Sequence, residues 1–321
     1  MKYNYPILVR YALLSVSCLS LQLFAGCMQE DERLLPREDS EKSLLGVSSL
    51  YADAGETSVT RAGVTSPLPA TETVGFFVKA NGSYYDAQDN KPGKYSSTAG
   101  MWLPNDSIWL NNVEAEIAVY HPYSASQSTS GLLNLAASLR TDDKKNLCSG
   151  RFRAHHRSKN VSVTLTHLYS RLLVTFVKDA AADYTGMSAL TRVALDGTGI
   201  YATATFQPVD SLYASYATSG YATDLSGVTI AGTNPAAVDA TRVDFLLPPS
   251  TLGSDVTLTA TVDTKEMKVT VPRTAFEGNA LLPGKQYNLK LTLKPTALVL
   301  SSLKITGWDA VAAFDQDATL E

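Results

Sequence analysis

Three observations predict that the chain folds as an all-β protein. Short runs rich in Val, Thr, Tyr and Phe recur along it, each bounded by Gly, Pro, Asn or Asp, which is typical of strands between turns. Several runs alternate apolar and polar residues, as half-buried strands do. Beyond residue 26, no stretch has the apolar spacing of an amphipathic helix. Many short strands separated by turns are typical of β-sandwiches, and the length of the chain suits two antiparallel sandwiches in tandem.

The individual strands follow from these patterns in chain order. We expect strands over residues 71–80, 115–123, 161–167, 171–179, 191–197, 200–206 and 241–249. Residues 256–262 and 267–271 alternate most clearly, and the polar stretch from Asp263 to Glu266 between them predicts a hairpin turn. Residues 285–294 form a further alternating strand that Pro295 ends, and the last strand is expected over residues 298–308.

The first 26 residues have the composition of an export signal. Lys2 and Arg10 are basic, residues 11–26 carry no charge, and small residues end the segment. At about 1.5 Å per residue, this apolar run is short for a helix that spans a membrane. We therefore expect residues 1–26 to be a cleaved signal peptide.

Cys27 stands where the apolar run stops. The sequence Phe-Ala-Gly that precedes it resembles a bacterial lipobox, although Leu23 lies one place earlier than the leucine that is usual there. The resemblance implies that the thiol of Cys27 is acylated and that Cys27 becomes the first residue of the mature lipoprotein. Several acyl chains of the palmitate kind on one residue would provide stable membrane anchoring.

Three acids, Glu30, Asp31 and Glu32, follow the cysteine. They resemble the acidic export signal of surface lipoproteins in Bacteroidales-type bacteria, and a run of charges is also typical of a solvated tether. Both interpretations agree with a lipid-anchored protein on the outer surface of the cell outer membrane.

Composition limits the remaining possibilities. The mature chain would hold 295 residues (321 minus 26), 45% of the whole chain is apolar, and the net charge is −4, so no basic surface for nucleic acid is indicated. Beyond Cys27 only Cys148 remains, and one thiol forms neither an internal disulfide nor a cysteine metal site. The polar stretch 140–160 places a division near residue 158, which gives a tether and first strand over 27–61 and domains over 62–158 and 159–321.

The sequence offers no support for an enzyme, a cofactor or a metal centre. It lacks a nucleophile elbow, a glycine-rich phosphate loop and the paired histidines of a zinc protease. His155 and His156 are adjacent, so on a strand they would point to opposite faces. His167 continues the apolar face of Val163 and Leu165, and we expect a hydrogen-bonded histidine at the edge of the core.

Two groups of aromatic residues are candidates for ligand binding. Residues 207–240 are rich in Ala, Ser, Thr, Gly and Tyr, and they predict either a long surface loop that displays Tyr213, Tyr216 and Tyr221 or an irregular connection with some strand content. Trp102 and Trp109 form the only spaced tryptophan pair, for which core packing is the ordinary interpretation.

Arg61 lies between a polar stretch and a segment rich in Gly, Pro and Ser. Such segments are exposed and are the usual sites of proteolysis. Upstream, residues 44–51 contain enough apolar side chains for one strand. The order is therefore lipid, acidic tether, one strand, arginine, and then the first domain.

This order, together with later segments, resembles the fimbrillin family, the subunits of type V pili in Bacteroidales. The similarity runs in sequence order from Cys27 to Trp308. The segments that carry it are Thr60-Arg61-Ala62 before the strand ETVGFFV, AVYHPYS (118–124), LTHLYSRLLVTF (165–176), and LLPGKQYNLKLTL with LSSLKITGWDA (281–310).

The resemblance implies two transthyretin-like β-sandwich domains in tandem and a defined maturation. A surface protease specific for Arg or Lys would cut after Arg61, leave Ala62 as the new N-terminus, and remove the strand within residues 44–60. Arg33 and Arg37 are competing sites whose cleavage would leave that strand in place. A strand from another pilin subunit would then fill the groove, and head-to-tail repetition would give a fimbrium. Residues 296–306 or the tail 310–321 would be the donor.

Two other functions stay open at this point. A surface lipoprotein that captures glycans for a nutrient-uptake system would also be lipidated and built of β-sandwiches. A surface hydrolase would need an acid/base pair, for which the sequence gives no positive sign. Within the pilus interpretation, a tip subunit would use residues 207–240 to bind an external ligand on a host or bacterial surface.

Overall fold

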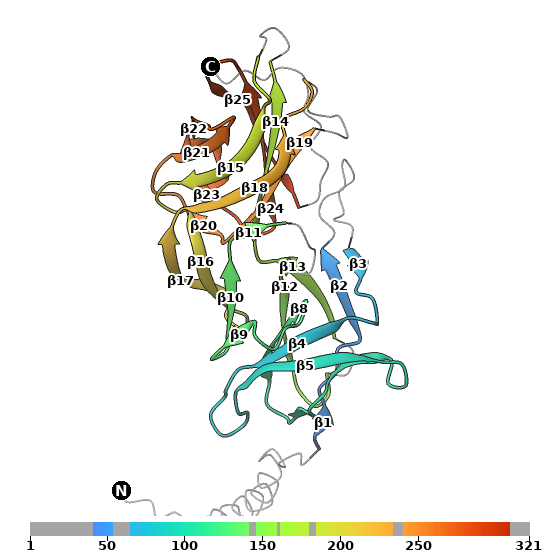
Figure 1. Ribbon diagram of the computed structural model, residues 1–321. Helices are drawn as coiled ribbons and strands as arrows, with labels where there is room; N and C mark the ends of the chain where they lie inside the picture. Colours follow the sequence, from blue (N-terminus) through green and yellow to red (C-terminus); the bar gives the residue numbers. More distant parts are fainter. Residues whose placement is uncertain are drawn as a thin grey trace, which may run out of the picture. The chain divides into compact units, whose positions relative to one another are not determined.

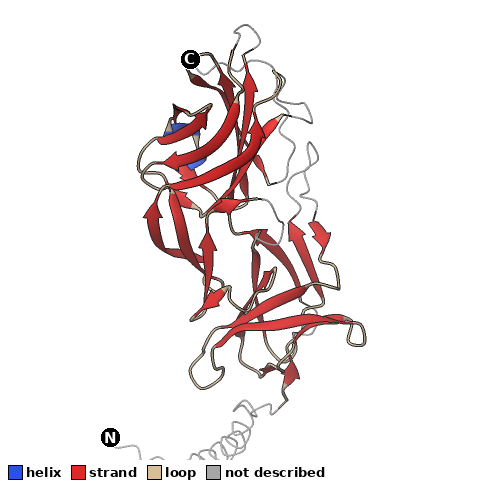
Figure 2. Cartoon of the chain, viewed as in Figure 1, coloured by secondary structure: helices blue, strands red, loops and turns tan. Residues whose placement is uncertain are grey.

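Strands make up nearly all of the regular structure of the computed structural model (Figure 2), which confirms the all-β prediction. The structure describes residues 41–53, 65–140, 146–158, 161–179, 184–233 and 240–308. Within these ranges the helical elements are two short 3-10 turns, Arg273–Ala275 and Glu277–Asn279. Residues from Ser43 onward form one unit, and the N-terminal unit before it ends at Lys42.

An eight-stranded sheet, here called the N-terminal sheet, contains most of the early strands. Its order is β3 (Thr65–Pro67), β2 (Ser49–Asp53), β13 (Ser162–His167), β12 (Cys148–Ala154), β8 (Ala115–His121), β4 (Thr73–Val78), β5 (Gln88–Ser96) and β6 (Met101–Pro104). A separate two-stranded pair joins β1 (Ser43–Leu44) to β7 (Trp109–Leu110). Inward side chains of these strands form one buried core that includes Val74, Phe76, Trp102, Ile117, Val119, Val163 and Leu165.

The two ends of the N-terminal sheet meet. Val47, two residues before the start of β2, forms an isolated antiparallel bridge to Trp102 of β6. Because β2 lies near one end of the strand order and β6 is the last strand at the other, this bridge closes the sheet around its core.

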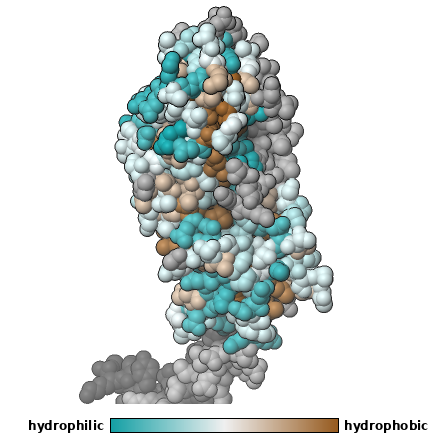
Figure 3. All heavy atoms as spheres, viewed as in Figure 1, coloured by the Kyte–Doolittle hydropathy of each residue, from teal (hydrophilic) through white to brown (hydrophobic). Residues whose placement is uncertain are grey.

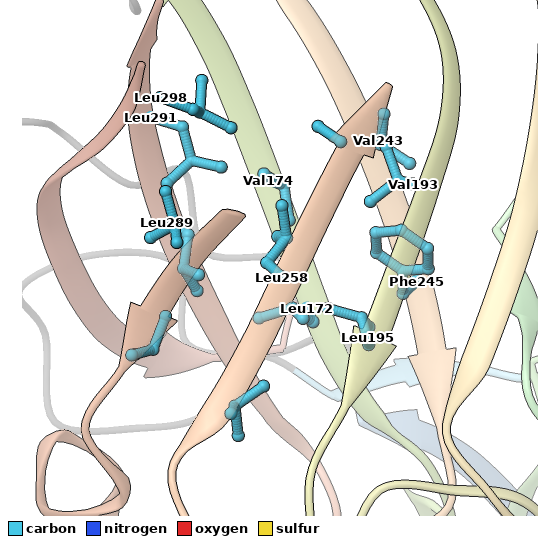
Figure 4. Close-up of a cluster of buried hydrophobic side chains, with 14 of the residues drawn as sticks. Leu172, Val174, Val193, Leu195, Val243, Phe245, Leu258, Leu289, Leu291 and Leu298 are labelled. Carbon is cyan, nitrogen blue, oxygen red and sulfur yellow. The ribbon is translucent and has the colours of Figure 1, made fainter. Parts of the chain in front are cut away.

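Two further sheets enclose a second core and form the C-terminal sandwich (Figure 1). One sheet has the order β11 (Ser138–Leu139), β19 (Thr241–Leu247), β14 (Ser170–Lys178), β24 (Lys285–Leu293) and β25 (Leu298–Gly307). The other has the order β18 (Tyr221–Thr229), β15 (Ala189–Asp196), β21 (Val256–Val262) and β22 (Lys265–Val271). A small pair joins β20 (Ser250–Thr251) to β23 (Ala280–Leu281). Figure 4 shows the apolar side chains of both sheets pointing into the space between them, among them Leu172, Val174, Val193, Leu195, Val243, Phe245, Leu258, Leu289, Leu291 and Leu298.

A third sheet joins strands from distant parts of the chain. Its order is β17 (Leu212–Ser219), β16 (Tyr201–Gln207), β10 (Leu132–Ala136) and β9 (Ser128–Thr129). Strand pairing therefore runs across residue 158, since β10 pairs with β16 and β11 pairs with β19. The division at residue 158 and the tandem arrangement stay predictions.

A third buried cluster, the junction cluster, connects the N-terminal sheet with later strands. Phe77 and Tyr120 face it from β4 and β8, and its other members include Leu133, Leu135, Phe206, Leu246 and Trp308. Tyr120 is fully buried, and its ring occupies the space above Gly75, where an added Cβ would lie 1.9 Å from ring atom Cε1. The Tyr120 hydroxyl donates to Asn90 Oδ1 at 2.6 Å, and burial raises its pKa to about 12.

Two strand pairs differ from the predicted antiparallel arrangement. β2 runs parallel to β13, and β14 runs parallel to β24. Parallel partners need a long connection between them, and local sequence patterns contain no signal for pairing across such separations.

Residues 207–240 are not the predicted surface loop, and they contain more strand than the alternative prediction, an irregular connection with some strand content. Residues 212–219 form β17 and residues 221–229 form β18, and these strands lie in two different sheets. The Tyr213 hydroxyl donates to the Leu168 carbonyl and that of Tyr216 to the Pro249 carbonyl, both at 3.0 Å. The small residues and weak apolar alternation of this stretch predicted at most some strand content. Pairing with neighbouring strands, rather than local preference, decides the structure here.

The predicted hairpin after residue 262 is confirmed and is tighter than expected. Its turn residues, Asp263 and Thr264, have positive φ values of 48° and 70°, which is the geometry of a two-residue type I′ turn. The Asp263 carboxylate accepts hydrogen bonds at 2.9 Å from the N–H groups of Ala189 and Ser188 and from the Tyr184 hydroxyl. The hydrogen bond from Ala189, followed by those from Ser188 and Tyr184, holds the pKa of Asp263 below its ordinary value of 3.8.

Replacement of Asp263 by Asn tests this carboxylate. Asn also tolerates positive φ, so Asp263→Asn keeps the turn and removes the charge. The folded-state pKa of Asp263 lies below 3.8, the value of an unperturbed aspartate. The stability that the ionised carboxylate contributes is therefore fully present above pH 3.8. It is lost as the pH falls toward the folded-state pKa. We expect the variant to melt at a lower temperature near neutral pH, with the difference shrinking below pH 3.8. Melting curves across this range would contradict the assignment if the difference stayed constant.

Candidate functional site

The first described segment, residues 43–53, is built into the N-terminal sheet from both sides. On one side, the Leu45 N–H donates to the Ile108 carbonyl at 2.8 Å, and Val47 exchanges backbone hydrogen bonds with Trp102 at 2.8 and 3.0 Å. On the other side, the Ser48 N–H donates to the Val161 carbonyl at 2.9 Å. We call residues 43–53 the first segment.

Three side chains of the first segment are buried almost completely. Leu45 and Val47 have no exposed surface and Leu50 is 2% exposed, and all three belong to the core of the N-terminal sheet. Gly46 lets the backbone approach β6, since an added Cβ would lie 2.3 Å from Met101 Sδ. The strand that the sequence predicted upstream of Arg61 is therefore present as β1, the Val47 bridge and β2.

The pairing of β2 defines which of its side chains face inward. Leu50 lies opposite Val163 and Ala52 opposite Leu165 in the parallel register with β13, so Leu50 and Ala52 share the core face. Ser49 faces the other way, and its hydroxyl lies 2.6 Å from that of Ser162. On its other edge β2 pairs with the short strand β3.

The predicted site residues Cys27, Arg61 and Ala62 lie outside the described residues, as do Arg33 and Arg37. The places of Arg61 and Ala62 in the sequence show which elements a cut there would separate. Arg61 and Ala62 belong to the connection between the end of β2 at Asp53 and the start of β3 at Thr65. A cut after Arg61 would thus separate the first segment covalently from every later strand.

Among the described residues, Cys148, Asn146 and His167 are residue types with catalytic chemistry that lie together, and the contacts described do not have the geometry of a nucleophilic relay. Cys148 Sγ lies 3.1 Å and Asn146 Oδ1 lies 3.2 Å from the same nitrogen, Nδ1, of His167. A nucleophilic relay needs the base to contact the nucleophile and the orienting group through different ring nitrogens. Cys148 and His167 are also 5% and 6% exposed, and the His167 ring stacks on Trp308 with centroids 4.2 Å apart.

The hydrogen-bonded histidine predicted at position 167 is thereby confirmed, and its role is packing between the N-terminal sheet and Trp308. His156 is buried as well, and its Nδ1 lies 3.1 Å from the Asn111 carbonyl oxygen. Among the residues that the structure describes, no group of acids, histidines and cysteines could hold a metal ion.

Trp102 and Trp109 do not form a shared binding surface. Trp102 is 2% exposed and packs edge-on against Tyr95, whereas Trp109 is 56% exposed on β7. On the face drawn in Figure 3, hydrophobic residues reach the surface in small groups among hydrophilic ones. Within the described part of the chain, no helix is long and apolar enough to cross a membrane.

A charged group that no sequence pattern predicted lies on the outer side of β4, β8 and β12. Lys79 lies 2.6 Å from Asp210 and 3.3 Å from Glu116, and Arg153 lies 2.9 Å from Glu116. The Asp210 and Glu116 carboxylates, in that order, raise the pKa of Lys79. Because Asp210 comes from the turn between β16 and β17, no local pattern could have predicted its contact with Lys79.

Comparison with known proteins connects this architecture to a family. A sequence profile described as fimbrillin-like matches residues 60–308. A search of curated protein sequences finds no match. A solved structure of a proposed cell adhesion protein from Bacteroides uniformis is similar, with a TM-score of 0.56 and 16% identity over 83% of this chain and 98% of that one. A proposed cell adhesion protein from Bacteroides ovatus is similar with a TM-score of 0.55 and 15% identity over 84% of this chain and 100% of that one.

The burial of the first segment predicts a large difference between two leucines within it. Leu50→Ala should lower the free energy of unfolding by about 2–5 kcal/mol, because it leaves a cavity in a closed core. Leu44→Ala is the matched control: Leu44 is 37% exposed, and its replacement should change stability by about 0.5 kcal/mol or less. Denaturant unfolding of both variants measures the difference, and equal effects would contradict the assigned burial.

Proposed function

The chain belongs to the fimbrillin-like family, and from this premise we propose that it is a structural subunit of a surface pilus that polymerises by strand exchange. The observation that carries the proposal is the position of the first segment, which closes the N-terminal sheet and fills its core with Leu45, Val47 and Leu50. The proposed maturation begins with a lipoprotein held to the outer membrane through Cys27.

Removal of the first segment would create an acceptor groove with two properties. Backbone groups at Trp102, Ile108 and Val161 would lose their partners, and β13 would lose the parallel neighbour on its edge. Three apolar spaces would open in the core at the same time. A groove with unpaired backbone and empty apolar spaces binds an extended strand from another chain.

Cleavage after Arg61 is the step that would make removal possible. Before cleavage, the first segment occupies its own groove, so the lipid-anchored precursor is complete and has no site for a second subunit. After cleavage, only noncovalent contacts hold the segment, and the chain that begins at Ala62 retains β3 and all later strands. A surface protease specific for Arg or Lys is the implied partner for this step.

The last strand of the described chain has side chains that match the groove. The inward residues of the first segment are Leu45, Val47, Leu50 and Ala52, with successive spacings of two, three and two. In β25, Leu298, Leu300, Leu303 and Ile305 face the sandwich core with the same spacings, because a bulge at Ser301 shifts the register there. β25 is also an edge strand, paired only with β24 within its sheet.

This match supports residues 298–307 as the donor. Since the spacing of two, three and two reads the same in both directions, β25 would fit the groove in either orientation. One subunit would give its last strand to the groove of the next, and this head-to-tail contact does not close on itself, so it generates a filament.

The cleavage step can be tested at Arg61 with Arg37 as its control. Mass measurement or N-terminal sequencing of protein from intact cell surfaces should find Ala62 at the N-terminus of the native chain and of Arg37→Ala. Arg61→Ala should remain a lipid-bearing monomer that begins at Cys27. Polymers formed by uncleaved Arg61→Ala would show that strand exchange needs no cleavage there.

The donor assignment can be tested by disulfide trapping between two differently tagged chains. In the present structure Thr164 lies opposite Tyr51. A donor strand in the orientation of β2 would place Lys304 at the Tyr51 position. A donor strand in the reverse orientation would place Val299 there. Thr164→Cys in one chain should crosslink with either Lys304→Cys or Val299→Cys in another, and Lys268→Cys on β22 should not react. Polymers without either crosslink would exclude β25 in this register.

A further inference from the structure

Two hollows on the outer side of β12 are both lined by Arg151. One has a volume of about 430 Å³ and is lined by Lys79, Glu116, Arg153 and Asp210, among others. The second, about 330 Å³, is lined by Thr164, Thr166, Ser211 and Tyr213, among others. Volumes of roughly 300–1,000 Å³ are usual for small-molecule sites. We call the two together the Arg151 hollow.

Among the described residues, the charges of the Arg151 hollow leave one lining cation without a carboxylate partner. Lys79 and Arg153 contact the two carboxylates of the lining, those of Asp210 and Glu116. Arg151 is exposed, and no carboxylate among the residues that the structure describes lies within ion-pair distance of it. The lining itself holds three cations and two carboxylates, and Arg153 also pairs with Glu114 at 3.6 Å beside it. The cation that these pairs leave over is Arg151, whose guanidinium can hold a carboxylate with two parallel hydrogen bonds.

The second hollow adds hydroxyl groups and an aromatic ring beside Arg151. The Thr164 and Ser211 side chains are exposed and are available for hydrogen bonds to a ligand. The Tyr213 ring is held in place by its hydroxyl, which donates to the Leu168 carbonyl at 3.0 Å, and by Phe206, whose ring centroid lies 4.8 Å away. The β16–β17 turn supplies Asp210 and Ser211, and β12 supplies Arg151 and Arg153, so distant parts of the chain build the hollow jointly.

We propose that the Arg151 hollow binds a saccharide that carries a carboxylate. Arg151 pairs with the carboxylate, the Thr164 and Ser211 hydroxyls bind hydroxyl groups of the sugar, and the Tyr213 ring contacts its apolar face. The Thr164 and Ser211 hydroxyls and the Tyr213 ring favour a sugar over an acidic peptide, because binding a peptide carboxylate would need only the Arg151 guanidinium. This ligand belongs to the proposed pilus subunit, and the inference rests on that proposed function, which places the Arg151 hollow at the cell surface.

The test uses the full chain and defined sugars in titration calorimetry or ligand-observed NMR. The probes are the methyl glycosides of N-acetylneuraminic acid and glucuronic acid. The comparison compounds are the methyl ester of the glucuronide, which lacks the charge, and acetate and N-acetylglutamate, which lack the sugar. We expect at least one acidic sugar to bind, and its ester, acetate and N-acetylglutamate to bind at least about tenfold more weakly.

Arg151→Ala should weaken binding of the acidic sugar by at least about tenfold. Arg192→Ala is the control, because Arg192 is an exposed arginine on β15 that pairs with Asp224 at 2.8 Å and lines neither hollow. It should bind like the native chain, and unchanged melting curves would show that both variants fold.

Several results would overturn the proposal. One is that neither acidic sugar binds. A second is that the ester, acetate or N-acetylglutamate binds as strongly as the acidic sugar. A third is that Arg151→Ala binds the acidic sugar as strongly as the native chain does. Failure of the proposed function gives a different result. Arg151 lies outside the first segment and outside β25, so Arg151→Ala should polymerise normally. Native chains that bind the sugar but never polymerise would contradict only the pilus function.

Discussion

Burial of Leu45, Val47 and Leu50 between the two ends of one sheet is the interaction on which the N-terminal part of the structure depends. A sheet whose end strands stay apart leaves backbone groups unpaired and one side of its core open. The first segment resolves both problems, because its backbone bonds to Trp102 and Ile108 on one side and to Val161 on the other. The same contacts make it the element whose loss would change the molecule most.

The first segment is held by contacts that a single cut in the chain does not alter. Its hydrogen bonds and apolar contacts are to residues far along the sequence, such as Val163, which lies opposite Leu50. A cut in the connection to β3 would therefore leave the folded state intact at first and remove only the covalent tether. Exchange for another strand would then depend on competition between two occupants of one groove, in which side-chain spacing decides the fit.

The junction cluster has a different role, since it fixes distant strands on the outer side of the N-terminal sheet. Tyr120, Phe206 and Trp308 fill its centre, and His167 stacks on Trp308. Its packing sets the position of the β16–β17 turn, whose Asp210 reaches Lys79. The Arg151 hollow lies where these surfaces meet. Lys79 and Arg153 of its lining pair with carboxylates, whereas Arg151 has no carboxylate of the described residues within ion-pair distance.

The sequence by itself determined the all-β class, most strand positions after residue 160, the hairpin turn at Asp263 and the presence of a strand before Arg61. These features depend on the local alternation of apolar and polar residues and on the residue types at turns, both of which a single sequence contains. Only the tertiary structure decided that β2 runs parallel to β13, that β17 and β18 are strands, and that Cys148 and Asn146 share one nitrogen of His167. It also decided that no carboxylate of the described residues lies within ion-pair distance of Arg151. Each of these depends on contacts between residues far apart in the chain, and no local pattern of side chains encodes which distant residues will meet.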